Sequence, residues 1–382
     1  MATIRKRLLK GGEERWQVDF KDALGKRRGK LFVRKKDADR FLVDARARIA
    51  AGTYIHDAES ITVLAAAQAW IDQCRARRDA GRRMEATTYR DYDDKVRLHI
   101  CDPVVGLGAI KLSRLNRKAI NEFRDALLAH GRSEGTVRKV LGVLRLVFAH
   151  AQDNGEIAIN PADGVRVHAT RRTAEPIQAP PKEAVRRLIE AARDMFRPLV
   201  IVTALCGLRA SEARGLTWDA VDLEGGYLHI RQRADAYNVM GEPKSEAGRR
   251  SIPMGPMVVS ALRQWRAQCP ITPLGLVFPA RDGGIVRHDG LVRFMFKGTI
   301  ERLRKAHRAN PDTVPDIKPF RWHDLRHFAV SLWIEQGFSV KEVMSFAGHA
   351  SVQMTMERYG HLFPSPEHHR AMAEVEARIF QV

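Results

Sequence analysis

A proline-rich stretch divides this chain and limits how it can fold. Residues 168–181 read HATRRTAEPIQAPP, with three prolines and almost no large apolar side chain. Such a segment cannot contribute to a packed core, and its prolines favour an extended connection. We therefore expect a linker over residues 166–181, so that the 382 residues fold as separate domains rather than around one core.

The charge of the chain predicts an anionic partner. Its 65 Lys and Arg outweigh 45 Asp and Glu, which gives a net charge of +20 and a pI near 10.2. Nucleic acid and an acidic membrane surface are the usual partners of such a protein. No apolar run approaches the roughly 20 residues that span a bilayer, and the N-terminus lacks the apolar core of a signal peptide. We interpret the protein as soluble and cytoplasmic, without a membrane partner.

The four cysteines are far apart and form no CxxC pair. They therefore predict neither a disulfide framework nor a zinc knuckle, and they fit a reducing cytosol.

The first 55 residues predict a small sheet packed on one helix. Apolar residues alternate with polar ones over 16–20, which is typical of a strand. From Asp37 onward the apolar residues fall on one helical face, and Gly52 is placed to stop that helix. Residues 1–55 hold 16 Lys and Arg against 7 Asp and Glu, and 13 of the 16 cations precede Asp37. A solvated surface would explain these charges, but a strand patch that binds nucleic acid is the favoured interpretation.

Residues 61–165 predict a helical bundle. Thr62 and Asn116 are expected to cap two helices, and Thr87 or Thr88 a third. The clearest helical stripe consists of Val137, Val140, Leu141, Leu144, Val147, Phe148 and Ala151, and Asn154-Gly155 closes it.

Residues 182–382 predict a mostly helical domain with a small sheet. Two strand-like runs, 227–233 and 249–254, flank a glycine-containing hairpin, and helical patterns dominate afterward. The expected fold class is thus multidomain and mainly α: an N-terminal sheet-plus-helix module, a helical bundle, and an α+β C-terminal domain with a small antiparallel sheet.

Candidate chemistry is concentrated in three motifs of the last domain. They are GLRASE at 207–212, HDLRH at 323–327, and GH at 348–349 followed ten residues later by Tyr359. Each motif alone is weak, because each member has a structural alternative. Arg209 could pair with Glu212, His323 could cap a helix, and Tyr359 could be an ordinary residue of an amphipathic helix.

In this order, however, the motifs resemble those of the tyrosine recombinases, specifically the phage-type integrases. The family shows Arg, Lys, HxLRH, GH and Tyr in sequence, and residues 323–364 resemble it almost continuously. GLRASEARGLTWDAVD is similar to its first conserved box. The resemblance implies that residues 182–382 form a catalytic domain, residues 61–165 a core-binding domain, and residues 1–55 an arm-type DNA-binding module.

The resemblance also implies roles for particular residues. Arg209 and Arg326 match the two arginines that clamp the scissile phosphate, and Tyr359 matches the nucleophile. Guanidinium suits a phosphate because it stays charged and offers a planar fork of donors. A tyrosine has a pKa near 10, so it needs nearby cations or a proton acceptor to attack phosphorus. His323 matches the first histidine, and in a helix it would share a face with Arg326.

Three further residues complete the implied site. His349 matches the second histidine, and Lys244 matches the lysine that protonates the leaving 5′ oxygen, although a hairpin lysine is more often a solvated charge. Glu212 is expected to orient an arginine. For His327 we favour packing within the helix over a chemical role.

The predicted function is therefore site-specific DNA recombination. One strand is cleaved through a 3′-phosphotyrosine bond and rejoined to a partner strand, which integrates or excises a mobile element. No cofactor and no metal are expected. The expected partners are double-stranded attachment sites and three further copies of the chain, with an excisionase and a host DNA-bending protein as candidate accessories. The tail, 367–380, could pack on its own chain or on a neighbouring protomer.

Alternatives from other classes stay open at this point. A DNA-binding regulator could keep this fold without catalysis, and a relaxing topoisomerase would use similar chemistry. His323 and His327 have the i, i+4 spacing of a zinc hydrolase, but the sequence between them lacks the glutamate of HExxH.

Overall fold

The computed structural model describes residues 2–9, 11–22, 25–50, 54, 56–81, 84–167, 177–363 and 376–378. Contacts divide the chain into two units, Met1–Arg172 and Thr173–Val382. Several predicted features lie outside the described residues: Gly52, residues 168–176 of the linker, and residues 367–375 and 379–380 of the tail. Within the described part, no helix combines the length and the apolar character needed to cross a membrane.

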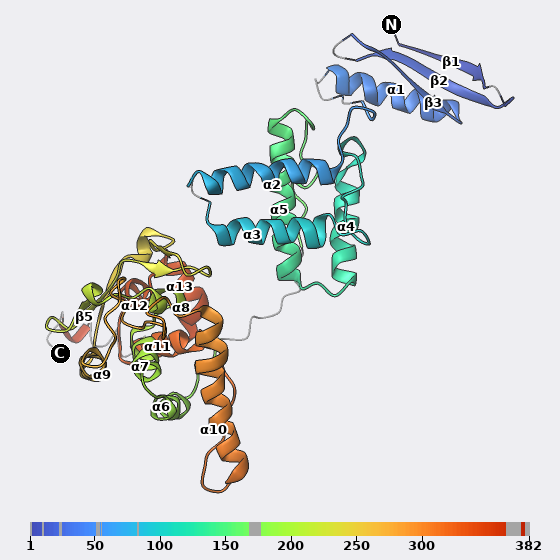
Figure 1. Cartoon of the computed structure of the whole chain (residues 1–382). Coiled ribbons are helices and arrows are strands. Elements are labelled where there is room, and N and C mark those ends of the chain that lie inside the picture. Colours follow the sequence, from blue (N-terminus) through green and yellow to red (C-terminus); the bar gives the residue numbers. More distant parts are fainter. Residues whose placement is uncertain are drawn as a thin grey trace. The chain divides into compact units, whose positions relative to one another are not determined.

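The N-terminal module is a three-stranded antiparallel sheet with one helix against it (Figure 1). Its elements are β1 (Thr3–Leu8), β2 (Glu14–Lys21), β3 (Arg27–Phe32) and α1 (Lys35–Ala50). The predicted alternation is correct, because Val18 and Phe20 are buried with Ala38 and Leu42 of α1. The helix begins two residues before Asp37, where the carbonyl of Arg34 already accepts its first hydrogen bonds.

The following segment is a helical bundle, as predicted. It contains α2 (Val63–Asp79), α3 (Ala86–Lys95), a π-helical turn (Val96–Ile100), α4 (Arg117–Ala129) and α5 (Glu134–Asp153). Every residue of the predicted stripe on α5 is buried, so the bundle core forms along this helix, which contacts α2, α3 and α4.

Two of the three predicted helix caps of the bundle are confirmed. The side chains of Thr62 and Asn116 accept hydrogen bonds from backbone amides three residues on, at 3.2 and 3.0 Å. The third prediction is wrong: α3 begins at Ala86, so both Thr87 and Thr88 lie inside it. The cap position is Glu85, whose side chain makes no capping hydrogen bond, and the Thr87 hydroxyl donates to the Glu85 carboxylate at 3.3 Å.

The C-terminal unit has the predicted α+β character. Its helices are α6 (Lys182–Ala191), α7 (Phe196–Cys206), α8 (Ala210–Arg214), α9 (Pro256–Arg266), α10 (Gly298–Ala309), α11 (Asp324–Glu335), α12 (Val340–Ala347) and α13 (Val352–Tyr359). A three-stranded antiparallel sheet has the order β4 (Val221–Asp222), β5 (Tyr227–Ile230), β8 (Arg250–Pro253), and a small hairpin pairs β6 (Arg233–Ala234) with β7 (Met240–Gly241). The first strand-like run is shorter than expected, because pairing with β8 ends at Ile230.

Helix α7 lies at the centre of this unit. Its sequence is apolar on nearly all sides, and all but two of its residues are buried, which is typical of a helix that other elements surround. It packs against α6, α9 and α11. The C-terminal end of α7 therefore lies inside the domain, next to the predicted site.

Candidate active site

Arg209 is positioned by a sharp turn between α7 and α8. Gly207 ends α7 with a left-handed backbone (φ 63°), and a Cβ there would lie 2.8 Å from the ring of Trp333, so glycine is required for both reasons. The chain then turns, and Arg209 occupies the cap position of α8. Glu212 accepts from the Arg209 backbone amide at 2.9 Å and from its Nη1 at 2.7 Å. The predicted pairing is therefore present, and Glu212 orients Arg209.

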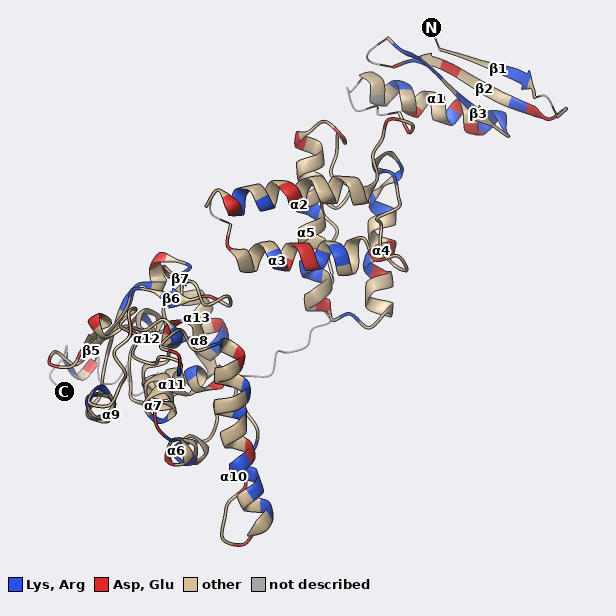
Figure 2. Ribbon diagram, viewed as in Figure 1, with Lys and Arg blue, Asp and Glu red and all other residues tan. Residues whose placement is uncertain are grey.

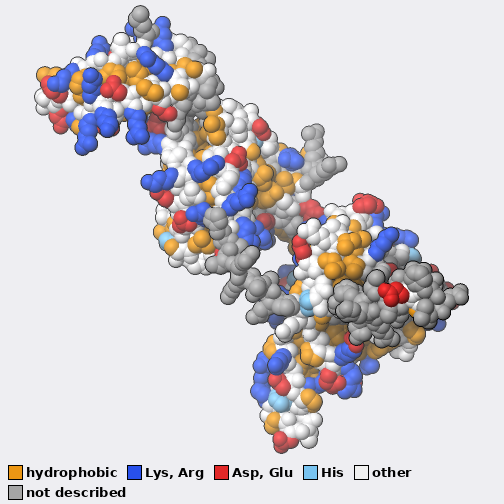
Figure 3. Space-filling model, turned by 180° about the vertical axis from the view of Figure 1, so that it is seen from behind, with side chains coloured by type: hydrophobic (Ala, Val, Ile, Leu, Met, Phe, Trp, Pro, Cys, Tyr) orange, Lys and Arg blue, Asp and Glu red, His pale blue; other side chains and the backbone are white. Residues whose placement is uncertain are grey.

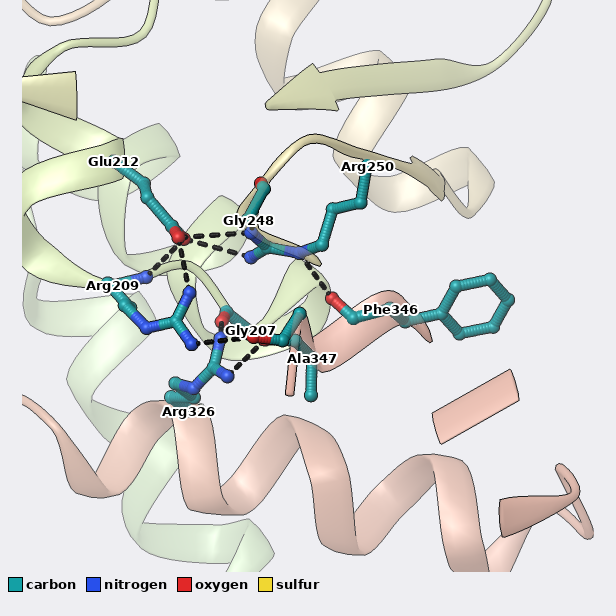
Figure 4. Close-up of polar contacts among 9 residues, drawn as sticks. Gly207, Arg209, Glu212, Gly248, Arg250, Arg326, Phe346 and Ala347 are labelled. Atoms are coloured by element: carbon teal, nitrogen blue, oxygen red, sulfur yellow. Dashed lines mark hydrogen bonds and ion pairs between the residues drawn. The ribbon is translucent and has the colours of Figure 1, made fainter. Parts of the chain in front are cut away.

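Arg326 comes from α11 and is only 3% exposed. Its Nη1 donates to the carbonyl of Gly207 at 2.7 Å, and its Nη2 donates to the carbonyl of Ala347. Arg209 donates in the same way to the carbonyl of Gly348 at 2.9 Å (Figure 4). These carbonyls belong to the C-terminal ends of α7 and α12. Helix ends have unpaired carbonyls and partial negative charge, so they hold guanidinium groups well.

A third arginine in this cluster was missed by the sequence analysis. Arg250, the first residue of β8, donates to both carboxylate oxygens of Glu212 at 3.0 and 2.9 Å and to the carbonyl of Phe346 at 2.6 Å. A signal was present, because strand alternation places Arg250 on the same face as the buried Ile252. An inward-facing arginine needs a buried partner.

The charges of this cluster do not balance. Three guanidinium groups surround one carboxylate, which leaves two positive charges in excess. Burial opposes ionisation of Glu212, but Arg250, followed by Arg209 and Arg326, outweighs burial and lowers the Glu212 pKa to about 2. Burial, followed by the charge of Arg209, lowers the pKa of Arg326 to about 9, so it remains protonated at neutral pH. The cluster can therefore accept an anion.

Tyr359 is the last residue of α13, and it packs against α11. Its side chain is only 1% exposed and packs with Val330 and Ile334 of α11. Burial raises the pKa of its hydroxyl, and the charges of Arg326 and Arg358 oppose that rise. The charge of Arg326, a predicted phosphate ligand, therefore acts on the hydroxyl of Tyr359, the predicted nucleophile.

Histidines surround the tyrosine. The ring of His349 stacks on that of Tyr359, with centroids 6.2 Å apart and planes 11° apart, and its Nδ1 lies 2.9 Å from Thr355 Oγ1. Nδ1 of His327 lies 2.5 Å from the Tyr359 hydroxyl oxygen. His327 is buried in its helix, as the packing interpretation expects, but this interpretation missed its contact with Tyr359. The available sequence signal for a position near the site was that His327 directly follows Arg326.

His323 and Lys244 lie at the edge of this arrangement. His323 precedes α11 and is exposed, and its ring meets that of His327 edge to face at 5.0 Å. Lys244 is exposed on the loop between β7 and β8, so it is not packed into the arginine cluster. The far end of that loop does reach the cluster, because the carbonyl of Gly248 accepts from Nη1 of Arg250 at 3.1 Å.

The arrangement has the parts needed for phosphoryl transfer. Arginine donors and excess positive charge can hold a phosphodiester, and a phenolic oxygen beside an imidazole can attack it. Within the described residues, no three His, Cys, Asp or Glu side chains come together where they could hold a metal ion.

Comparison with known sequences identifies relatives. A profile of the Phage integrase family matches residues 181–365. The ICEBs1 integrase of Bacillus subtilis (strain 168) is 27% identical over 266 residues, which span 67% of this chain and 69% of that protein. Tyrosine recombinase XerC of Xylella fastidiosa (strain 9a5c) is 30% identical over 254 residues, which span 65% of this chain and 77% of that protein.

Solved structures share the fold. The Tn1549 transposon integrase in complex with a circular intermediate DNA matches with a TM-score of 0.63 at 20% identity, over 83% of this chain and 99% of that chain. A lambda integrase tetramer bound to a Holliday junction matches with a TM-score of 0.55 at 15% identity, over 91% and 95%. The sequence relatives and this shared fold agree with the arginine, histidine and tyrosine motifs, and the chain therefore belongs to the phage integrase family, as a tyrosine recombinase acting in site-specific DNA recombination.

Proposed function

We propose that this recombinase cleaves and rejoins DNA strands through a 3′-phosphotyrosine intermediate and thereby integrates or excises a mobile element. In the forward step Tyr359 attacks the scissile phosphorus and a 5′ hydroxyl leaves. In the reverse step the 5′ hydroxyl of a partner strand attacks, and the tyrosine is released. The phosphodiester energy is kept in the covalent bond, so no nucleotide and no metal enters the scheme.

One observation carries this proposal. The Tyr359 hydroxyl contacts the residue that directly follows Arg326, on one turn of α11. Tyr359, at the end of α13, is thus in contact with α11, the helix that carries Arg326, and an enzyme that attacks a bound phosphate needs its nucleophile and its phosphate ligand held in such a fixed relation.

The arginines provide the phosphate clamp. Each guanidinium has five N–H donors, and the carbonyls of Gly207 and Ala347 use only part of this capacity in Arg326. The remaining donors can bind the nonbridging oxygens, where negative charge increases in the transition state. His349, whose ring stacks on that of Tyr359, completes the phosphate site.

We assign Lys244 as the general acid for the 5′ oxygen and His323 as a further phosphate ligand. Lys244 lies on the loop between the hairpin strand β7 and the anchored Arg250. Its exposed ammonium can therefore approach the leaving group on the DNA side of the cluster.

DNA binding beyond the phosphate is supported by the N-terminal sheet. Strand register places Arg5, Arg7, Arg15, Lys21 and Arg27 on the face opposite α1, and Figures 2 and 3 show Lys and Arg along this module. We propose that residues 1–55 bind arm-type sites, that residues 61–165 bind the core site, that residues 166–181 link the two units, and that residues 182–382 catalyse.

The proposed assembly is a homotetramer on two duplexes, which would provide four tyrosines for four strand cleavages. The solved tetramer of lambda integrase on a Holliday junction supports this stoichiometry for the shared fold. An excisionase and a host DNA-bending protein are the proposed accessories. Chromosomal DNA as substrate implies action in the cytoplasm.

The test uses an attachment-site duplex with a nick near the cleavage site. Cleavage then releases a short segment that carries the 5′ hydroxyl, so the strand cannot be rejoined and the covalent product accumulates. The unchanged protein should give an SDS-resistant adduct in which Tyr359 is joined to the 3′ phosphate of the strand segment upstream of the cut, while the downstream segment leaves with a free 5′ hydroxyl. Tyr359→Phe should give none, whereas Tyr227→Phe, at an exposed position on β5, should react at the normal rate. Adduct formation by Tyr359→Phe would refute the nucleophile assignment, and DNA binding without any adduct would favour the regulator alternative.

A further inference from the structure

We propose that His327 is the proton acceptor for the Tyr359 hydroxyl during strand cleavage. This inference rests on the proposed function, because it assumes that Tyr359 is the nucleophile. It gives a chemical role to a histidine that lies outside the phosphate-binding set of arginines and histidines.

Geometry selects His327 among the neighbouring imidazoles. Its Nδ1 lies 2.5 Å from the phenolic oxygen, within hydrogen-bonding distance, and both side chains are at most 5% exposed. His349 also contacts Tyr359, but it stacks on the ring face, and its Nδ1 is engaged with Thr355. For Nδ1 of His327 to accept the phenolic proton, the ring must carry its own proton on Nε2.

The surroundings keep His327 neutral. Burial, followed by the neighbouring His323, lowers its pKa to about 4, with smaller contributions from Arg358 and Arg326 in the same direction and from Asp324 in the opposite one. These groups come from α11, from His323 directly before it, and from α13, which carries Tyr359. With its proton on Nε2, the neutral ring has a lone pair on Nδ1 that can accept the phenolic proton, although the low pKa makes it a weak base until substrate adds negative charge nearby.

The tyrosine needs such an acceptor. Burial raises its pKa above the ordinary value of about 10, so a free phenolate is scarce at neutral pH. Removing the proton as the oxygen attacks avoids forming that phenolate first. A bound phosphodiester would also add negative charge beside Arg326, which raises the basicity of the imidazole when substrate is present.

The step balances in atoms and electrons. The phenolic oxygen forms a bond to phosphorus, and its proton passes to Nδ1 of His327. The bond from phosphorus to the 5′ oxygen breaks with its electron pair on that oxygen, which takes a proton from Lys244 in the proposed scheme. In the reverse step His327 returns its proton to the tyrosine. An imidazolium beside Arg326 and Arg358 is destabilised, which favours this return.

The test is single-turnover cleavage of the nicked substrate by His327→Asn. The amide can hydrogen-bond near the position of Nδ1 but cannot take a proton. We expect adduct formation to slow about 100-fold or more at neutral pH and to recover as the pH rises, because hydroxide then removes the proton. His361→Asn, at an exposed histidine two residues after Tyr359, should cleave at the normal rate.

A second substrate separates this role from leaving-group protonation. With sulfur at the bridging 5′ position, the leaving thiolate needs no proton. This substrate should restore cleavage by Lys244→Ala but not by His327→Asn. Restoration of His327→Asn, or cleavage by it within about threefold of normal at neutral pH, would overturn the inference.

A third measurement is made on the unchanged protein and does not depend on the activity of a variant. Nitrogen NMR of the unchanged full-length protein, labelled at histidine and assigned with His327→Asn or His327→Gln, should show His327 neutral at pH 7 with its proton on Nε2. A proton on Nδ1 or a charged ring would overturn the inference. A contrary NMR result would overturn the role of His327 but not the assignment of Tyr359 as the nucleophile. That assignment is refuted only by adduct formation with Tyr359→Phe.

Discussion

Arg250 and Glu212 form a two-point ion pair between β8 and α8, with side-chain exposures of only 3% and 4%. This contact joins the small sheet to the turn that carries Arg209. Glu212 thereby holds Arg209 and Arg250 in fixed positions relative to each other. Breaking a buried pair leaves a charge without its partner, which costs far more than losing a pair at the surface.

We therefore expect Arg250→Met to destabilise the C-terminal unit by about 3 kcal/mol. The matched control is its neighbour Arg249, whose ion pair with Glu242 is exposed. Arg249→Met should change the free energy of unfolding by no more than about 0.5 kcal/mol. Chemical unfolding of both variants measures the difference, and equal effects would contradict the structural role of the buried pair.

Arg326→Lys should abolish most cleavage although it keeps the charge. Lysine cannot donate to the carbonyls of Gly207 and Ala347 and still offer a planar fork to phosphate. We expect the single-turnover rate to fall about 100-fold or more, with weaker loss of DNA affinity. Arg321→Lys, on an exposed arginine that pairs with Asp324, is the control. A normal cleavage rate for Arg326→Lys would show that cleavage does not require the guanidinium group of Arg326.

Acid should destabilise the C-terminal unit below about pH 6.5. Burial, followed by Arg326, lowers the pKa of His349 to about 3, and the pKa of His327 is about 4. The unfolded chain binds these protons more readily, so stability is complete above pH 6.5 and is lost as the pH falls toward the folded values, by about 1.4 kcal/mol per pH unit for each histidine. Glu212, with its pKa lowered to about 2, adds a loss of the same sign below pH 4.5.

Urea unfolding at pH 7 and pH 5 measures this effect. His349→Asn should reduce the difference between the two conditions, because one of the two buried imidazoles is gone. A free energy of unfolding that stays constant or rises between pH 7 and pH 5 would show that these histidines are not held neutral.

Neutralising the outer face of the N-terminal sheet should weaken arm-site binding. The variant with Arg5, Arg7 and Arg15 changed to Gln removes three cations from the face opposite α1. The slope of log affinity against log salt should fall in magnitude by about 2 to 3, since each phosphate contact contributes about 0.9. Cleavage of a short core-site substrate provides the control and should be unchanged. Loss of core-site cleavage in the folded variant would contradict a separate role for the N-terminal module.

Local signals in the sequence determined much of this protein. The caps at Thr62 and Asn116 and the buried stripe of α5 follow from hydrogen bonds and periodicity within a few residues, so they were predictable. The cap predicted at Thr87 or Thr88 failed because α3 already begins at Ala86, which places both threonines inside the helix rather than at its cap position. The order of the motifs around Arg209, Arg326 and Tyr359 predicted the family by resemblance.

Tertiary structure alone decided how these residues meet. Arg250 reaches Glu212 from 38 residues away, and carbonyls at the ends of two separate helices hold Arg209 and Arg326. The contact between His327 and Tyr359 likewise joins two residues that are 32 positions apart and lie on different helices. A sequence lists donors and charges, but burial and distance determine which of them become partners and how their pKa values shift, and both arise only when the chain packs.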